Sequence, residues 1–405
     1  MRLPRIQYSW KALFGDVSGG VIAALIALPY GLAMASLMGL PPVLGLFTSL
    51  LTAPVTALLG RNPLLIGGTS SVTVPFIAEA VRQQGIGGAA KVTLVAAVIM
   101  MVFSVLRLGR FISKVPHSVV TGFSCGIGGM MVLAQIKLLS SMKIAAGANW
   151  LEPFLLAIAV TAACFVSNRF WPKAPAPLIA VIFGFLAAWG LSLRQPEVGY
   201  LTLALPPFAG FAWTPKDVYT VLPAGFGLAF VASVNILITS RVVEHFRGRR
   251  RSAKRADADA ELGAYGISNV LAGMFGAPLS VGIPARSLAN VRCGGTTRMS
   301  NLAHAAVLAA VIGLGSGVLA HIPIAALAGV TAWMGFCLLD WSAWRRIPKM
   351  RKADAAAFLS TAILVLGFNA VAAVAVGCAV YGVEWMWNRT RSTNAGSPVS
   401  AQSSA

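Results

Sequence analysis

The sequence predicts an all-α polytopic membrane protein, and three observations support this fold class. Of its 405 residues, 57% are hydrophobic and only 11% are charged, whereas average proteins carry about a quarter charged residues. Apolar stretches of about 20 residues recur along the chain. Lysine and arginine gather between these stretches, where they orient a membrane protein. We therefore attribute the net charge of +20 to topology and anionic lipid, and not to nucleic acid.

Fourteen membrane segments are predicted, in two sets of seven. The first set covers residues 16–38, 42–60, 67–82, 88–107, 116–137, 151–168 and 175–193. The second set covers residues 218–240, 258–275, 279–291, 299–320, 323–340, 354–368 and 369–387. The repeats are then residues 1–193 and 218–387, with an outer proline-rich connector at 194–217 and a disordered cytoplasmic tail at 388–405.

The positions of the basic residues support this count. With the N-terminus in the cytoplasm, the inner loops hold 25 of the 32 lysines and arginines, and the outside carries six, Lys91 among them. Both termini are therefore expected on the cytoplasmic side of the inner (plasma) membrane. No cleavable signal peptide stands out at the N-terminus.

Two of the segments, 67–82 and 279–291, are short and are interrupted by glycine and proline. Each is the third member of its set. Such a pair is the best sequence pointer to a transporter site between inverted repeats. We expect their helix N-termini to face each other at mid-membrane and to hold an anion, because a helix start exposes N–H groups and partial positive charge.

The third segment opens with Gly67-Gly68-Thr69-Ser70-Ser71. The glycines let an oxyanion approach the backbone, and the hydroxyls of Thr69, Ser70 and Ser71 can donate hydrogen bonds to it. A small-residue face that packs against another helix would have the same composition. The spacing alone leaves both interpretations open.

The tenth segment carries Arg286, the one basic residue that lies neither near a predicted segment end nor in a loop. A cation at membrane depth costs roughly 2.5–3.5 kcal/mol on insertion scales and is functional by default. Gly282, Ile283 and Ser287 belong to the same interrupted stretch. This stretch is the second half of the predicted anion site.

Carboxylates are few inside the predicted segments. Arg286 could instead be a structural cation paired with a carbonyl or with Glu79 or Glu261, which are the nearest candidates. The eighth segment has no acid, and its only strongly polar residue is Asn235. No chain of Asp, Glu or His that could relay protons is visible.

The first segment contains Leu28-Pro29-Tyr30-Gly31. Pro29 breaks the helix in its middle and frees backbone groups, which neighbours, water or a ligand must satisfy. Tyr30 and Met34 are four residues apart and share one helix face. Core packing explains this pattern equally well.

Enzyme, cofactor and metal chemistry are not expected. The five cysteines form no CxxC, and the four histidines form no HxxxH or HExxH. There is no P-loop, no GxSxG and no paired-carboxylate geometry. The sequence therefore predicts a transporter without a cofactor or a metal.

Three stretches resemble the sulfate permease (SulP) family of anion transporters. LPYGLAMASLMGLPPVLGLFTSLL (28–51) is similar to the first two helices of the family, and LLIGGTSSVTV (64–74) to the start of its third. The run from Asp257 to Gly295 is similar to the ninth and tenth helices, including Ala285-Arg286-Ser287 and Asn290.

The resemblance implies two inverted seven-helix repeats. Helices 1–4 and 8–11 would form a core domain, and helices 5–7 and 12–14 a gate domain, with an elevator-like movement between them. It also implies a homodimer and an anion held between the third- and tenth-helix N-termini. The residues that it places at the anion are Tyr30, Met34, Thr69, Ser70, Gly282 and Arg286.

The chain departs from the family pattern at two places. Members usually carry a cytoplasmic C-terminal STAS domain, and none is expected here, where the sequence stops at Ala405. Many bacterial members have an acidic residue in helix eight that is linked to cation coupling, where this chain has Asn235. Proton symport is therefore in doubt, and exchange, uniport or another coupling site such as Glu261 stays open.

The predicted function is secondary active transport of a small inorganic anion, sulfate first and bicarbonate second. A dicarboxylate carrier or a nucleobase-type permease of the same architecture is the alternative, although a nucleobase site is expected to need a carboxylate in helix eight or ten. A non-transporting membrane scaffold is the alternative of another class. The expected partners are a small anion, membrane lipid and a second copy of the chain, without nucleic acid.

Overall fold

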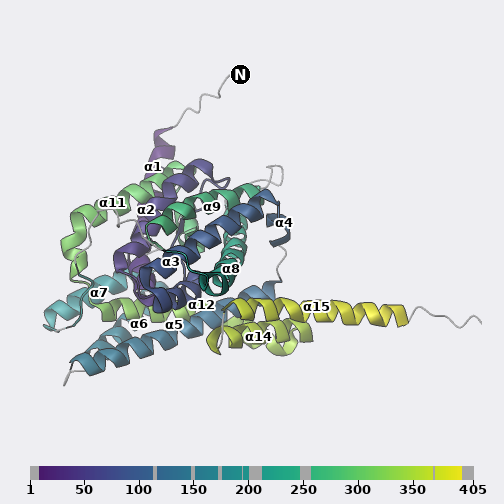
Figure 1. Ribbon diagram of the computed structural model, residues 1–405. Helices are drawn as coiled ribbons and strands as arrows, with labels where there is room; N and C mark the ends of the chain where they lie inside the picture. The colour runs from purple at the N-terminus through teal and green to yellow at the C-terminus, as the bar shows by residue number, and fades with distance from the viewer. Residues whose placement is uncertain are drawn as a thin grey trace, which may run out of the picture.

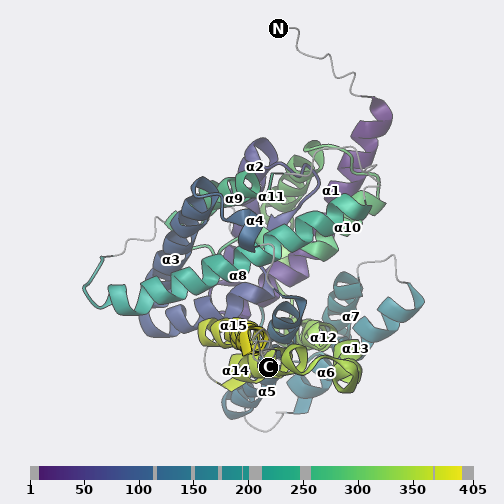
Figure 2. The same ribbon diagram turned by 90° about the vertical axis from the view of Figure 1, so that its right-hand side faces the viewer.

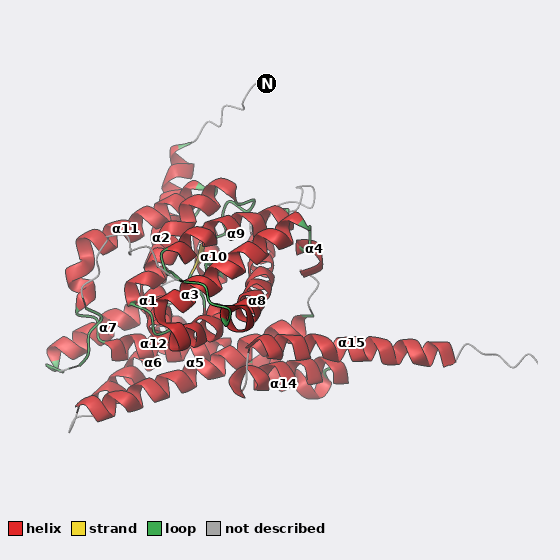
Figure 3. Cartoon of the chain, in the orientation of Figure 1, coloured by secondary structure: helices red, strands yellow, loops and turns green. Residues whose placement is uncertain are grey.

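The computed structural model describes residues 9–112, 116–146, 151–171, 176–193, 195–199, 212–246, 257–367 and 370–394. Helices make up nearly all of this part of the chain (Figure 3), so the predicted all-α class is confirmed. Seven described helices are long and apolar enough to cross a membrane, and three shorter apolar helices accompany them. The total of fourteen crossings stays a prediction.

The elements follow the predicted segments closely along the chain. The first half contains α1 (Trp10–Leu37), α2 (Pro42–Leu59), β1 (Gly67–Gly68), α3 (Val74–Val105), α4 (Gly109–Ile112), α5 (His117–Ala146), α6 (Leu151–Phe170) and α7 (Ala176–Gly190). The second half contains α8 (Asp217–Phe246), α9 (Ala258–Met274), β2 (Val281–Gly282), α10 (Pro284–Arg292), α11 (Met299–Ala320), α12 (Ile324–Leu338), α13 (Trp341–Arg346), α14 (Lys352–Gly367) and α15 (Ala370–Asn394).

Several boundaries differ from the prediction, and two of them change how the segments are connected. α3 runs through the predicted gap between the third and fourth segments, but it kinks at Gly85, whose φ of 63° is a conformation that favours glycine. α15 continues to Asn394, into the tail predicted as disordered from residue 388, because this tail has no glycine or proline before Gly396. Residues 395–405 of that tail lie outside the described residues.

The helices pack in two groups (Figures 1 and 2). The core group consists of α1, α2, α3, α8, α9, α10 and α11, which surround the two strands. The gate group consists of α5, α6, α7, α12, α14 and α15, which lie together in the lower part of both views. α1 contacts α7 and α12, and therefore lies at the seam between the groups. This packing agrees with the predicted division into core and gate.

The two short segments meet as a pair of strands at the centre of the core group. β1 and β2 are antiparallel, with Gly67 opposite Gly282 and Gly68 opposite Val281. The helical segments therefore begin later than predicted, because the backbone before them pairs across the two halves of the chain. α3 begins at Val74, directly after a 3-10 turn at Ser71–Thr73, and α10 begins at Pro284. Each helix has a proline in its first turn, where the missing N–H costs nothing.

α1 and α2 are in backbone contact where two glycines face each other. A Cβ atom at Gly45 would lie 2.0 Å from the carbonyl oxygen of Gly31. Glycine at such crossings lets membrane helices approach closely. The contact lies next to Tyr30, one of the predicted site residues.

Lys91, which the distribution of basic residues assigned to the outer side, is a second buried cation among the described residues. It lies inside α3, 6% exposed, and its Nζ is 2.9 Å from Oδ2 of Asp217 at the start of α8. Gln84 accepts a hydrogen bond from Lys91 and donates one to Asp217, both at 3.0 Å. The charge of Lys91 is thus compensated, and the pair ties α3 to α8.

Replacing Lys91 by methionine should destabilise the protein, because the change leaves the Asp217 carboxylate buried without its cation. We expect the midpoint of thermal unfolding in detergent to fall by about 5 °C or more. Adding Asp217→Asn, which keeps an acceptor for Thr214, should recover much of the loss. Arg82→Met breaks an exposed ion pair instead and should change the midpoint by no more than about 1–2 °C. A double variant no more stable than Lys91→Met would contradict this ionic role.

Candidate anion site

Arg286 lies in the first turn of α10 and is fully buried, with 0% of its surface exposed. Its Nη1 donates a hydrogen bond to Ser49 Oγ on α2 at 3.2 Å. The ring of Tyr30 on α1 lies 5.2 Å from its Cζ, a distance at which a cation interacts with an aromatic face. Nε and Nη2 have no hydrogen-bond partner among the described residues. Two donors of a buried cation are therefore available to a ligand.

Neither carboxylate predicted as a possible partner contacts Arg286, so the suggested pairing with Glu79 or Glu261 is wrong. Glu79 pairs with Arg82 at 2.8 Å on an exposed face of α3. Glu261 on α9 accepts hydrogen bonds from the backbone N–H groups of Arg61 and Asn62, at 2.6 and 2.9 Å, and so holds the chain after α2. In the described part of the chain, no carboxylate forms an ion pair with Arg286. A buried cation of this kind calls for a negatively charged ligand.

Gly68 brings the backbone of β1 directly against the guanidinium. A Cβ atom at this position would lie 2.3 Å from Arg286 Nη1 and 2.4 Å from Ser49 Oγ. Any larger residue would therefore displace Arg286. The glycines were predicted to let an oxyanion approach the backbone, and at Gly68 the group that lies against the backbone is the guanidinium of Arg286.

The hydroxyl residues after Gly68 divide into two kinds. Thr69 Oγ1 donates to the carbonyl oxygen of Gly45 at 2.8 Å, so its hydroxyl proton is already used. The N–H of Ser71 donates to the Tyr30 hydroxyl at 3.1 Å, which fixes the turn before α3. The side-chain hydroxyls of Ser70 and Ser71 donate to no described residue, and remain candidate donors to an anion.

Gly282, Ile283 and Ser287 form the framework of the other half. Thr239 Oγ1 on α8 donates to the carbonyl oxygen of Gly282 at 3.2 Å. Ser287 Oγ donates to the carbonyl oxygen of Ile283 at 2.8 Å and accepts from the N–H of Ile66 at 2.9 Å. These contacts place the first turn of α10 beside β1. The hydroxyl of Ser287 therefore links the first turn of α10 to the chain before β1.

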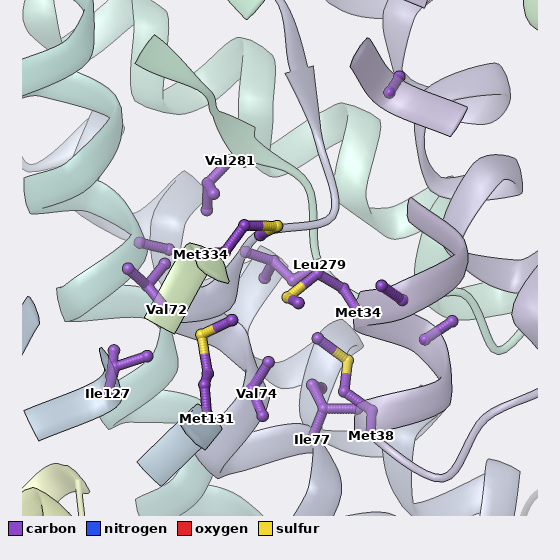
Figure 4. Close-up of a cluster of buried hydrophobic side chains, with 14 of the residues drawn as sticks. Met34, Met38, Val72, Val74, Ile77, Ile127, Met131, Leu279, Val281 and Met334 are labelled. Atoms are coloured by element: carbon purple, nitrogen blue, oxygen red, sulfur yellow. The ribbon is translucent and has the colours of Figure 1, made fainter. Parts of the chain in front are cut away.

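Met34 belongs to an apolar cluster beside the polar site. Figure 4 shows it near Leu279 of the core group, with Met131 of α5 and Met334 of α12 in the same cluster. The cluster thus spans the core and gate groups. We infer that Met34 excludes water next to the polar residues.

Asn235 on α8 lies one turn before Thr239, on the helix that contacts β2. Its Oδ1 is buried and has no hydrogen-bond partner within the described residues. A role of Asn235 or Glu261 in coupling stays a prediction.

Sequence reasoning missed the polar residues that support the site. Thr48, Ser49 and Thr52 line one face of α2, and the repeat of hydroxyls at four-residue spacing in an apolar helix could have revealed them. Asn269 on α9 forms two hydrogen bonds with the backbone of Ser280, at 2.6 and 2.9 Å. Thr52 Oγ1 also donates to Ser280 Oγ at 3.0 Å. The chain before β2 is therefore held by two helices.

Comparison with known proteins agrees with the resemblance. A family model described as the sulfate permease family matches residues 13–361. This chain belongs to the sulfate permease family. A probable sulfate transporter of Mycobacterium tuberculosis is 28% identical over 399 residues, which cover 91% of this chain and 70% of that protein. The bicarbonate transporter BicA of a Picosynechococcus species is 27% identical, covering 92% of this chain and 70% of that protein.

Solved structures show the same family fold. The transmembrane domain of a cyanobacterial bicarbonate transporter BicA has a TM-score of 0.80 at 25% identity, covering 90% of this chain and 98% of that chain. The murine anion transporter Slc26a9, in an inward-facing state, shares the fold with a TM-score of 0.78 at 18% identity. This sulfate permease family member is thus a membrane transporter of anions and not an enzyme.

Proposed function

We propose that this protein carries a small inorganic anion, sulfate first, across the inner membrane as a secondary active transporter. The observation that supports this most directly is Arg286, which is fully buried and has two nitrogens without an acceptor among the described residues. Lys91, the other buried lysine or arginine among the described residues, forms an ion pair with the carboxylate of Asp217. Arg286 has a serine and a tyrosine ring instead. Bicarbonate is the second candidate, because BicA is among the similar sequences and structures.

In this proposal the anion lies against Arg286, in front of the first turns of α3 and α10. Partial positive charge at these helix starts adds to the full charge of the guanidinium. The hydroxyls of Ser70 and Ser71 complete the set of donors. Together they replace the water that the anion loses on entering the protein.

Alternating access would be a movement of the core group, with its anion, against the gate group. The apolar cluster around Met34, Met131 and Met334 lies between the groups and would keep water from the site on one side. Both termini are assigned to the cytoplasm from the distribution of basic residues. A homodimer and this elevator step belong to the same proposal.

Purified full chain in proteoliposomes should take up radiolabelled sulfate saturably, and protein-free liposomes should not. Unlabelled sulfate should compete fully and uracil should not compete. Uptake of uracil without uptake of sulfate would favour a nucleobase-type permease. If correctly inserted protein transports none of sulfate, bicarbonate or succinate, the transport proposal is wrong and the scaffold alternative returns.

A further inference from the structure

A buried polar cluster joins α11 to the elements that carry the anion site. Asn290 Nδ2 on α10 donates to Ser300 Oγ on α11 at 2.8 Å. Asn301 Nδ2 on α11 donates to the carbonyl oxygen of Leu65, just before β1, at 2.9 Å. Asn290, Ser300 and Asn301 are all 0–1% exposed. α11 is therefore connected to both halves of the site.

His304 lies one helix turn beyond Ser300 and Asn301 on α11. It is 0% exposed, and neither Nδ1 nor Nε2 has a hydrogen-bond partner among the described residues. Burying a polar group without a partner is unfavourable, and an imidazole has two such nitrogens. No role in the site as described so far accounts for this histidine.

His304 and Arg286 are each four residues along their own helix from the hydrogen bond between Asn290 and Ser300. Arg286 precedes Asn290 by four residues on α10, and His304 follows Ser300 by four residues on α11. Each is therefore one helix turn from this contact.

We propose that His304 is the proton-binding residue of this transporter, and that its imidazole takes up one proton when a divalent anion binds at Arg286. The inference rests on the proposed anion site. In this proposal His304 is neutral without an anion, because a second uncompensated positive charge in the same buried cluster is unfavourable. A dianion brings two negative charges, of which Arg286 compensates one and protonated His304 the other. The proton comes from the solvent with the anion and leaves with it.

The other charged or titratable side chains described on helices packed against α11 do not fill this role. Asp16 on α1 accepts hydrogen bonds from the backbone N–H groups of Thr296 and Thr297. Tyr30 lies against Arg286, and Arg292 at the end of α10 is exposed. α2 carries no charged residue.

The carboxylates first suspected of coupling are engaged elsewhere. Glu79 lies on an exposed face of α3, with Arg82. Glu261 is bound by two backbone N–H groups of the chain after α2. His304 is distinguished from both by its burial one helix turn beyond Ser300 and Asn301 and by its two nitrogens without a partner among the described residues.

Calorimetric titration of the full chain with sulfate, in buffers of different ionisation enthalpy, counts the protons bound with the anion. Between about pH 5.5 and about pH 8, we expect up to one proton per sulfate. By linkage, the dissociation constant for sulfate should fall as the pH falls, by at most about tenfold per pH unit.

His304→Gln keeps a polar side chain of similar reach but cannot take up a proton. We expect it to bind sulfate without proton uptake and with an affinity independent of pH. His321→Gln is the matched control, because His321 is an exposed histidine paired with Glu197 far along the chain from the site. It should behave as the wild type. If His304→Gln does not fold, His304→Asn takes its place, and the wild-type proton count decides independently of either variant.

If the wild-type protein binds sulfate in a way that requires Arg286 but takes up no proton, this inference is wrong and the proposed function stands. Proton uptake that persists in a folded His304→Gln protein would also overturn it. If the wild type binds no sulfate at any pH, the proposed function fails and this inference fails with it.

Discussion

Sulfate uptake should be abolished when Arg286 is replaced by glutamine. Among the described residues, the change removes the only full positive charge at the proposed anion position, together with the two nitrogens that have no described acceptor. Removing one partner of a buried charge interaction typically costs 2–5 kcal/mol, so the affinity for sulfate should fall by about 30-fold or more. Because transport requires binding, uptake by proteoliposomes should fall at least as far.

The folded protein should tolerate this substitution without sulfate. No described carboxylate pairs with Arg286, so glutamine leaves no opposite charge unpaired, and the thermal unfolding midpoint should stay the same or rise. Arg292→Gln, an exposed basic residue at the other end of α10, is the control and should leave uptake within about twofold. Unchanged uptake by Arg286→Gln, at matched insertion, would rule out the role given to this arginine.

Gly45→Ala should impair both stability and transport. The new methyl group would lie 2.0 Å from the Gly31 carbonyl oxygen, which is backbone and cannot rotate away. Overpacking of this kind typically costs 1–3 kcal/mol, and α1 must move away from α2. Tyr30, next to Gly31, supports both the N–H of Ser71 and the guanidinium of Arg286, so the shift reaches the anion site. We expect sulfate uptake to fall by about tenfold or more.

Thermal unfolding in detergent and uptake at matched insertion measure the two effects separately. Gly382→Ala in α15 is the matched control, because nothing lies within 4 Å of the added methyl group. It should be neutral or slightly stabilising, by up to about 1 kcal/mol. If both glycine variants behave alike, the close crossing of α1 and α2 does not position the site.

Hydropathy and local spacing were sufficient to predict the helices. An apolar stretch must bury its backbone groups in hydrogen bonds of its own wherever lipid surrounds it, so its length and composition already indicate a helix. The two short segments were recognisable for the same reason, because glycine and proline interrupt them. Arg286 stood out because a charge is rare at that depth in a segment.

The sequence by itself thus determined the helical class, the two interrupted segments and the arginine within the second of them. Only the tertiary structure decided which charges have partners, since Lys91 meets Asp217 across 126 residues and Arg286 meets Ser49 across 237. It also decided that the interrupted segments start as paired strands and that Glu261 holds a loop. These outcomes depend on contacts between distant segments, which a local pattern of hydropathy does not contain.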